Sequence, residues 1–318
     1  MTRLIRCVDQ IFVKAELDNP GCSHKFRAAQ YIIEHAIKAG KIIAGKTTII
    51  EKTGGNFGFG LLAASSTYGV DVDLAVGLSF SKRKSDLLEF LGARLIGKEM
   101  LASGMTPKDV VQHHLDHQQL LGKDYFYTDQ FQNQMGVEAH RRLTGAELAS
   151  QLHQEGINDA VIFVGCAGTG ASFTGISLAL REAGFDVTAM LVEPAGCDMR
   201  TGQFSEHRIE GASVGVPAPF LDWNLVKDVY VIYPNEVLTT QRWFYFQTGL
   251  LVGNSSAATI AIARKIKSDN RYKNTPVVTI AYDSGLWYDD FMAVTLASSQ
   301  KTDHCDSQFV AKLHQNVG

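Results

Sequence analysis

The sequence predicts an α/β fold of two packed lobes, in which parallel β-sheets are covered by helices on both faces. Short runs rich in β-branched residues alternate with helical patterns along the whole chain. These runs are apolar throughout, as expected for strands that are buried on both faces. The length of 318 residues suggests two domains or one large unit, and no low-complexity linker separates the halves. We therefore expect two lobes in close contact.

The first half of the chain predicts a helix followed by a βαβα pattern. Apolar residues recur at helical spacing from Phe26 to Ile37, and Ser23 is the expected N-cap of this helix. Farther along, strands are expected at 47–51, 72–76 and 94–97, with helices from about residue 58 and over 85–92.

The second half repeats this alternation. Strands are expected at 160–165, 187–193, 226–234 and 276–285, with one helix from residue 172 and two helical stretches before the last strand. A change in composition over 144–159 leads us to divide the chain into an N-terminal lobe, 1–140, and a C-terminal lobe, 141–318. Ligands of such folds bind beyond the carboxyl ends of the strands, so site residues are expected there.

Composition and charge argue against several classes of function. The formal net charge is −3 and no run of like charges could act as a polyanion-binding tail, so no nucleic-acid partner is expected. No segment approaches the roughly 20 apolar residues of a membrane span, and the N-terminus has no apolar signal segment. We therefore expect no membrane partner and a cytoplasmic location. Five scattered cysteines without a CxxC pair argue against a disulfide framework. His113 and His117 lie one helical turn apart, but no third ligand accompanies them, so no metal is expected.

Lys25 occupies an unusual place for a lysine. It is expected in the first turn of a helix, where the partial positive charge of the helix N-terminus disfavours a cation. Either its amine points into water, or it is retained there for chemistry. Desolvation and the helix terminus both lower the pKa of such an amine and favour its neutral, nucleophilic form.

Three further motifs lie where a ligand could bind. Two are glycine-dense loops that follow predicted strands, and the third is a pair of serines at the start of a predicted helix. In TGGNFGFG (53–60), glycines let the backbone approach an anion such as a carboxylate, although an ordinary turn would look similar. GCAGTGAS (165–172) precedes a helix and suits a phosphate, but a dinucleotide-binding loop with Glu193 as the ribose ligand competes. Ser255 and Ser256 begin a helix, either as its cap or with a hydroxyl in a cleft.

In this order the motifs resemble those of the fold type II pyridoxal phosphate enzymes, and most closely cysteine synthases. NPGCSHKFR (19–27) resembles the family's NPGGSVKDR, TGGNFG (53–58) its TSGNTG, and GTGAS (168–172) its GTGGT. The likeness continues in DQFQN (129–133), TGAEL (144–148), VEPAG (192–196), GLLVGNSSAA (249–258) and DSGLWY (283–288). It implies a two-lobed fold like the tryptophan synthase β-subunit, with pyridoxal 5′-phosphate in the cleft between the lobes.

The resemblance also implies a role for each matched residue. Lys25 would hold the cofactor as a Schiff base and then act as general base. Asn56 would bind the phenolic oxygen of the cofactor, and Ser255 would face its pyridine nitrogen. The phosphate would lie against Gly168, Thr169, Gly170, Ala171 and Ser172. The substrate would be bound by Thr53, Gly54, Gly55, Phe57, Gln130 and Gly211.

The implied activity is β-replacement on an O-activated serine through an α-aminoacrylate, in the simplest case cysteine synthesis from O-acetylserine and sulfide. A serine hydroxyl does not keep the pyridine nitrogen protonated, so the cofactor is a weaker electron sink and expulsion of a β-leaving group is favoured. The substrate is a small amino acid, and the resemblance implies a homodimer.

Some residues depart from the family pattern and leave alternatives open. Gly54 and Phe57 replace a serine and a threonine, so two hydroxyls of the substrate loop are missing. A β-elimination lyase or dehydratase, and a biosynthetic β-substitution enzyme with a non-sulfide nucleophile, remain alternatives. A nicotinamide dehydrogenase built on 165–172 and Glu193 would leave Lys25 without a role. A catalytically silent relative that binds a partner would lack bound cofactor.

Overall fold

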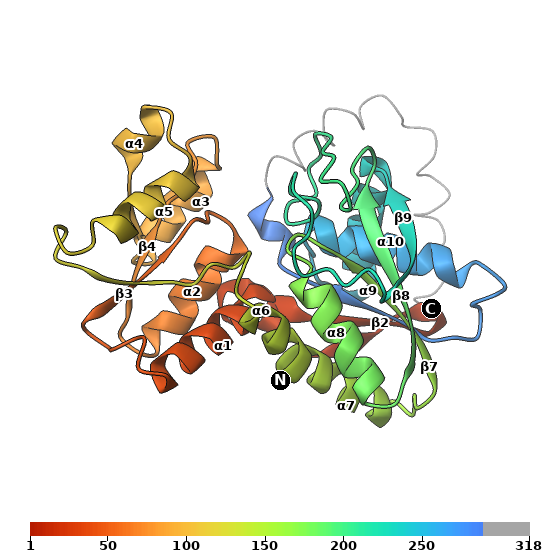
Figure 1. Cartoon of the computed structure of the whole chain (residues 1–318). Coiled ribbons are helices and arrows are strands. Elements are labelled where there is room, and N and C mark those ends of the chain that lie inside the picture. The colour runs from red at the N-terminus through yellow and green to blue at the C-terminus, as the bar shows by residue number, and fades with distance from the viewer. Residues whose placement is uncertain (289–318) are drawn as a thin grey trace.

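The computed structural model describes residues 1–288, which form two lobes around two β-sheets (Figure 1). The larger sheet has six strands in the order β1-β2-β10-β7-β8-β9, and the smaller has four in the order β5-β4-β3-β6. Among the strand pairs of residues 1–288, only β1–β2 is antiparallel. The α/β fold with parallel sheets is confirmed.

The strands of the described residues range from 2 residues in β5 to 9 residues in β8. Their bounds are β1 (Leu4–Arg6), β2 (Ile11–Ala15), β3 (Thr47–Glu51), β4 (Asp71–Leu74), β5 (Arg94–Leu95), β6 (Asp124–Tyr127), β7 (Ala160–Cys166), β8 (Asp186–Pro194), β9 (Val226–Ile232) and β10 (Val277–Ala281).

The helices alternate with these strands. Their bounds are α1 (Lys25–Lys38), α2 (Asn56–Ser66), α3 (Lys82–Phe90), α4 (Lys98–Ala102), α5 (Pro107–Asp116), α6 (Met135–Ala139), α7 (Ala146–Gln154), α8 (Ala171–Glu182), α9 (Pro234–Thr248) and α10 (Asn254–Lys267). A π-helical segment, His140–Gly145, joins α6 to α7, and short 3₁₀ helices lie at Val8–Gln10, Glu16–Asp18, Pro20–Cys22 and Gly285–Trp287.

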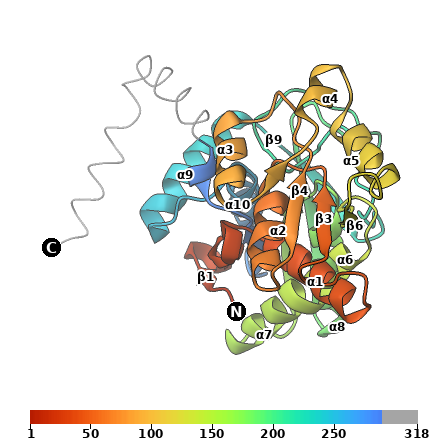
Figure 2. The same cartoon turned by 90° about the vertical axis from the view of Figure 1, so that its left-hand side faces the viewer.

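In the smaller sheet, β3 is buried along its whole length, as expected from its apolar residues, and helices lie on both sides of the sheet (Figure 2). Ile49 and Ile50 are neighbours in β3 and both are fully buried, but they belong to different cores because successive strand residues point to opposite faces. Ile49 packs in the core that contains α1 and α2 residues, whereas Ile50 packs with Val110 of α5.

The larger sheet is also covered by helices. Phe163 of β7 packs on Phe173 of α8 with ring centroids 5.4 Å apart, and α10 contacts β10 and β7. The largest hydrophobic core of the described residues lies here. Strands β1 and β2 join this sheet beside β10, although they come from the N-terminus. The expected N-terminal lobe, 1–140, included residues 4–15. In the structure these residues belong to the larger sheet, whose other strands come from the second half of the chain.

The start of α1 differs from expectation. Ser23 is not the N-cap: α1 begins at Lys25, His24 occupies the N-cap position without a side-chain hydrogen bond, and Ser23 forms an isolated bridge with Asp283. His24 precedes the helix and donates its backbone N–H to the carbonyl of Tyr282, 2.8 Å away. These contacts fix the beginning of α1 against the carboxyl end of β10.

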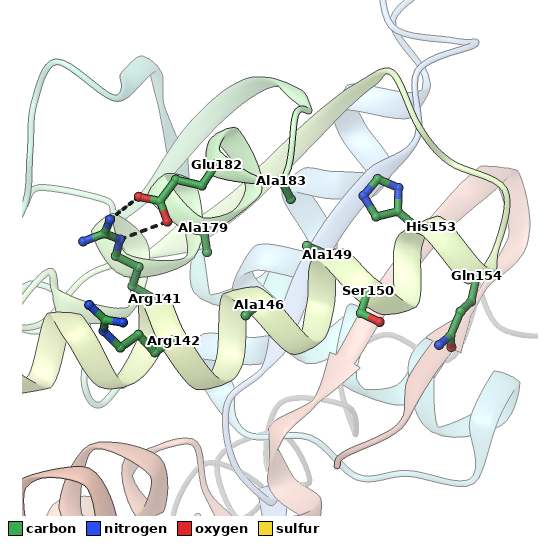
Figure 3. Close-up of a pocket in the computed structure, with 10 residues that line it drawn as sticks. All are labelled: Arg141, Arg142, Ala146, Ala149, Ser150, His153, Gln154, Ala179, Glu182 and Ala183. Carbon is green, nitrogen blue, oxygen red and sulfur yellow. Dashed lines mark hydrogen bonds and ion pairs between the residues drawn. The ribbon is translucent and has the colours of Figure 1, made fainter.

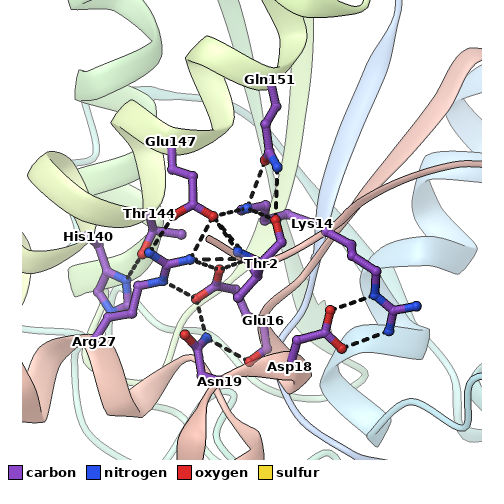
Figure 4. A network of polar contacts seen from close by, with 11 residues as sticks. Thr2, Lys14, Glu16, Asp18, Asn19, Arg27, His140, Thr144, Glu147 and Gln151 are labelled. Atoms are coloured by element: carbon purple, nitrogen blue, oxygen red, sulfur yellow. Dashed lines mark hydrogen bonds and ion pairs between the residues drawn. The ribbon is translucent and has the colours of Figure 1, made fainter.

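A buried charge network holds the first turn of the same helix (Figure 4). Arg27 donates two hydrogen bonds of 2.7 Å to Glu16 and two, of 3.0 and 3.1 Å, to Glu147 of α7. Lys14 of β2 is fully buried and pairs with Glu147, which also accepts the backbone N–H of Thr2 at 2.7 Å. Two cations and two carboxylates thus compensate each other and tie the larger lobe, through β2 and α7, to α1 two residues after Lys25.

Candidate functional site

A cavity of about 300 Å³ lies between the lobes, beyond the carboxyl ends of the central strands of both sheets. This is the place where ligands bind in open α/β folds. The structure brings most of the sequence-predicted site residues into its wall: Lys25, Thr53, Gly55, Asn56, Phe57, Gln130, Gly168, Thr169, Gly170, Ser172, Gly211 and Ser255. Gly54 and Ala171 do not line it.

Lys25 is the first residue of α1 and reaches the cavity without an ion-pair partner among the described residues. Burial lowers the pKa of its amine to about 8. A Cβ at Gly60 of α2 would come within 3.0 Å of the backbone of Lys25, so this glycine allows α2 to pack directly against the start of α1. The site therefore presents an amine that is readily neutral.

Two histidines lie close to Lys25 and are themselves kept neutral. The rings of His24 and His140 are 5.5 Å apart, and burial followed by the charge of Lys25 lowers the pKa of His140 to about 3. The pKa of His24 is lowered for the same reasons. His24 lines the cavity, and its buried Nδ1 has no hydrogen-bond partner among the described residues. Lys25 is thus surrounded by groups that do not compensate a positive charge.

Asn56 begins α2 and is held by a buried carboxylate. Its Nδ2 donates a 2.6 Å hydrogen bond to Oδ2 of Asp283, which also accepts the hydroxyl of Tyr288. Burial raises the pKa of Asp283 to about 6, although both hydrogen bonds oppose this. The amide of Asn56 is fixed in orientation, and its remaining polar atoms are available at the cavity wall.

The loop before α8 forms a cradle that no larger residues could form. A Cβ at Gly168 would lie 2.5 Å from the carbonyl oxygen of Gly211. Gly170 has a φ of +87°, and its Cβ would lie 2.4 Å from the backbone nitrogen of Leu221. The loop leads into the N-terminus of a 12-residue helix, where free amides and the helix dipole favour an anion. These residues fit a phosphate group.

Ser255 faces the cavity and does not cap its helix. Gly253 is the N-cap of α10, and no side chain caps this helix. Ser255 is almost fully buried and lines the cavity, whereas the Ser256 hydroxyl accepts a 2.8 Å hydrogen bond from the backbone of Tyr282. Of the two sequence interpretations, the structure therefore selects the hydroxyl in the cleft for Ser255.

Gly54 has a structural reason to lack a side chain. A Cβ at this position would lie 2.7 Å from both Phe80 and Val76, whose side chains fill the space beside the loop. Phe80 is also part of the cavity wall. The aromatic ring thus occupies the region into which a serine at residue 54 would project.

We expect Gly54→Ala to destabilise the protein by about 1–3 kcal/mol, because the new methyl group overpacks Phe80 and Val76. Gly55→Ala is the matched control, since a Cβ there meets nothing within 4 Å. Urea unfolding of both variants measures the difference. A smaller effect of Gly54→Ala in a Phe80→Ala background than in the unmodified protein would identify the ring as part of the obstacle. Equal stability of Gly54→Ala and Gly55→Ala would contradict this account.

Several wall residues were not identified from the sequence: Phe80, Phe131, Cys166, Glu210, Val214 and Tyr288. Phe80 follows the carboxyl end of β4, so the strand-end rule could have indicated it. Three others lie within motifs quoted above: Phe131, Cys166 and Tyr288. No feature of those motifs indicated that these particular side chains would face a ligand. Glu210 and Val214 come from the long connection between β8 and β9, which has no pattern that predicts its position.

A second hollow of about 810 Å³ is an open groove on the outside of the larger lobe (Figure 3). It lies over the π-helical segment, α7 and α8, and shares no lining residue with the cavity. Its charged residues include the ion pair between Arg141 and Glu182. We assign no chemistry to this groove, although it is the larger of the two.

The remaining sequence expectations have these outcomes. Glu193 accepts a 2.9 Å hydrogen bond from the backbone of Met199 and does not line the cavity, so the dehydrogenase alternative has no ribose ligand there. Within residues 1–288 no three His, Cys, Asp or Glu side chains are grouped as a metal site would require, and no helix is long and apolar enough to cross a membrane. Cys7, Cys22, Cys166 and Cys197 are free, and Cys305 lies outside the described residues.

Comparison with known proteins identifies the family to which the sequence is similar. Residues 2–283 match the model of the family described as pyridoxal-phosphate dependent enzyme. The chain is 30% identical over 287 residues to a probable cysteine synthase of Bacillus subtilis, covering 88% of each chain.

Solved structures of similar sequence have the same fold. A hydrogen sulfide-producing enzyme of Fusobacterium nucleatum is 28% identical with a TM-score of 0.77, covering 90% of this chain and 94% of the other. An O-acetylserine dependent cystathionine β-synthase of Helicobacter pylori is also 28% identical, with a TM-score of 0.73 and coverage of 91% and 94%.

Proposed function

Because the chain belongs to the pyridoxal-phosphate dependent enzyme family, we propose that its cavity catalyses β-replacement on O-acetyl-L-serine. The observation that supports this most strongly is the set of groups gathered in one wall. A readily neutral lysine, a fixed asparagine amide, a glycine cradle at a helix N-terminus and a buried serine hydroxyl all face the same space. These are the groups that the cofactor requires at its aldehyde, ring and phosphate.

The cofactor, when bound, supplies an electron sink that weakens the bonds at the α-carbon of an amino acid. In our proposal Lys25 holds it covalently, and Gly168, Thr169, Gly170 and Ser172 bind its phosphate. The nearby Ala171 provides a backbone amide from the first turn of α8. Asn56 and Ser255 hydrogen-bond the two sides of the ring.

Lys25 also moves the proton in this proposal. Once released from the cofactor, its neutral amine takes the α-proton of the substrate and returns it to the product. The substrate carboxylate is bound by Thr53, by Gln130 and by backbone amides of the loop residues that line the cavity, Gly55 and Asn56. Phe57, Phe80 and Gly211 close the space around the reacting carbon and exclude water, which favours replacement over hydrolysis.

The proposed reaction is tested with O-acetyl-L-serine and sulfide, measuring acetate release and cysteine formation by the protein supplied with cofactor. Equal yields of acetate and cysteine are the expected result. Acetate together with pyruvate and ammonia, but without cysteine, would instead favour the β-elimination alternative. Acetate release that requires a different nucleophile would retain the replacement chemistry and exclude sulfide as the second substrate.

The depressed pKa of Lys25 predicts how its reactivity depends on pH. Burial disfavours the charged amine, so its neutral fraction rises about tenfold per pH unit up to about 8 and then levels. Acylation of Lys25 in the cofactor-free protein, followed by peptide mass spectrometry, measures this directly. The rate in a reference peptide continues to rise toward about pH 10.4. A Lys25 profile that matched the peptide would contradict the proposed environment.

We also propose that the enzyme is a cytoplasmic homodimer. The dimer is supported by the family resemblance, and the location by the four free cysteines of the described residues, which suit a reducing compartment. Sedimentation equilibrium of the full chain tests the first of these proposals.

A further inference from the structure

A buried carboxylate lies directly behind the two loops that carry Thr53 and Gln130. Glu51 is the last residue of β3 and has no exposed surface. The loop 53–57 follows it in the chain, and Gln130 follows the neighbouring strand β6. Thr53 and Gln130 line the cavity, whereas Glu51 is not among the lining residues. Glu51 therefore lies where the two loops leave the sheet.

Each oxygen of Glu51 binds one of these loops. Oε1 accepts a 2.9 Å hydrogen bond from the backbone N–H of Lys52, the residue before Thr53. Oε2 accepts a 2.6 Å hydrogen bond from the hydroxyl of Thr128 and one of 3.2 Å from the backbone N–H of Gln130. One side chain thus bridges the segments that follow β3 and β6.

This bridge lies where the pairing of the two strands becomes weak. The backbone N–H of Thr128 still points to the carbonyl oxygen of Ile50, but the N···O distance is 3.4 Å, which is long for such a bond. Asp129 then has a φ of +44°, a left-handed conformation that is uncommon for a residue other than glycine. The position of Gln130 therefore depends on its contact with Glu51 more than on strand pairing.

The environment of Glu51 is unfavourable for a group that only stabilises the fold. Burial raises the pKa of its carboxyl, and its hydrogen bonds oppose this rise. Glu16 is equally buried but is paired with the guanidinium of Arg27, whereas the donors to Glu51 are a hydroxyl and two backbone N–H groups. A buried carboxylate held only by neutral donors costs free energy, and next to a cavity it is a candidate for a functional role.

We propose that Glu51 is a positioning residue for the substrate, and that its bridge holds Thr53 and Gln130 at the separation at which both bind an α-carboxylate. This inference rests on the proposed function, which places the substrate carboxylate at these two residues. Glu51 does not touch the substrate and acts only through the two loops. Its removal should therefore weaken the binding of ligands that have this carboxylate and spare those that lack it.

Two ligands that differ only at the carboxylate test the role of Glu51. L-Serine has the carboxylate, L-serinamide has a neutral amide in its place, and neither has an acetate to release. Binding of each to the cofactor-loaded protein is titrated through the visible absorption band. We expect the unmodified protein to bind L-serine at least about tenfold more tightly, because a charge-assisted hydrogen bond contributes roughly this factor or more.

Two variants weaken the bridge to different extents. Glu51→Gln keeps the size of the side chain, but its NH2 group cannot accept a hydrogen bond, so one loop loses its acceptor. We expect the preference for L-serine to fall below about threefold, with little change for L-serinamide. Thr128→Val removes one donor and should give an intermediate preference. Thr48→Val is the matched control, since Thr48 is a buried threonine near the other end of β3, and it should leave the preference unchanged.

A bridge that merely stabilised the fold would give a different pattern. Glu51→Gln would then weaken the binding of both ligands by the same factor, and this result, or an unchanged preference for L-serine, would overturn the inference. Thermal unfolding shows whether each variant is folded. If Glu51→Gln does not fold, Thr128→Val decides the question: a reduced preference supports the inference and an unchanged one contradicts it.

Failure of the proposed function is distinguished by the reaction itself. In that case O-acetyl-L-serine and sulfide give no acetate, whereas a preference for L-serine that is lost in Glu51→Gln would still support the role of Glu51. If the unmodified protein binds L-serine and L-serinamide equally, the two loops do not hold a carboxylate, and the inference fails whether or not acetate is released.

Discussion

Lys25→Ala is expected to lower the rate of β-replacement by at least about a thousandfold. The substitution removes the proposed covalent anchor of the cofactor and also the proposed general base, a role worth about 10²–10⁴ by itself. We propose this role because Lys25 combines a cavity position with a pKa lowered to about 8, and no carboxylate of residues 1–288 forms an ion pair with it. Acetate release from O-acetyl-L-serine measures the effect.

Lys38→Ala is the control for this experiment, since Lys38 is an exposed residue at the other end of the same helix. It should retain activity close to that of the unmodified protein. If Lys25→Ala retained more than about a tenth of the activity, the base would have to be another group. His24, which is neutral, unpartnered at Nδ1 and part of the cavity wall, would then be the first to examine.

Glu147→Gln is expected to destabilise the fold by about 3–5 kcal/mol, the cost of leaving a buried charge without its partner. The network contains two cations, Lys14 and Arg27, and two carboxylates, Glu16 and Glu147. Removal of one carboxylate leaves an excess positive charge around a fully buried Lys14. Urea unfolding measures the loss. Glu182→Gln is the control, because its ion pair with Arg141 is largely exposed and should contribute less than about 1 kcal/mol.

The same network predicts a response to acid. Burial alone would raise the pKa of Glu147, but hydrogen bonds from Arg27 and Lys14 lower it to about 2. A carboxyl with a depressed pKa in the folded state stabilises the protein above its unfolded pKa, and this contribution is lost as the pH falls toward 2. Between about pH 4.5 and 2, Glu147→Gln should therefore lose less stability than the unmodified protein. Parallel losses would show that Glu147 is not the titrating group.

Local patterns predicted much of the fold and of the site. Strands such as Thr47–Glu51 and Ala160–Cys166 are short, apolar and bounded by turn residues, so periodicity identifies them. Lys25, Asn56 and Ser255 lie at or near the start of helices, and such positions are visible in the sequence as capping and glycine patterns. Their convergence on one cavity follows from the strand-end rule.

Features that depend on tertiary packing were not predicted. The charge at Glu210 reaches the cavity only because an irregular connection folds over it, and Phe80 does so because Gly54 leaves room for its ring. Strands β1 and β2 pair beside β10, from which they are separated by most of the chain, and no local pattern specifies that partner. Ser23 has the composition of an N-cap, but its backbone is used in a bridge with Asp283. Each of these outcomes depends on a contact between distant residues.

The most direct test of the account is the visible absorption spectrum of the protein supplied with pyridoxal phosphate, recorded before and after O-acetyl-L-serine and again after a thiol nucleophile. We predict a cofactor band that is absent from Lys25→Ala, shifts when O-acetyl-L-serine is added, and returns to its first position when the nucleophile is consumed. A band that is unchanged by O-acetyl-L-serine, or that persists in Lys25→Ala, would contradict the proposed reaction at this cavity.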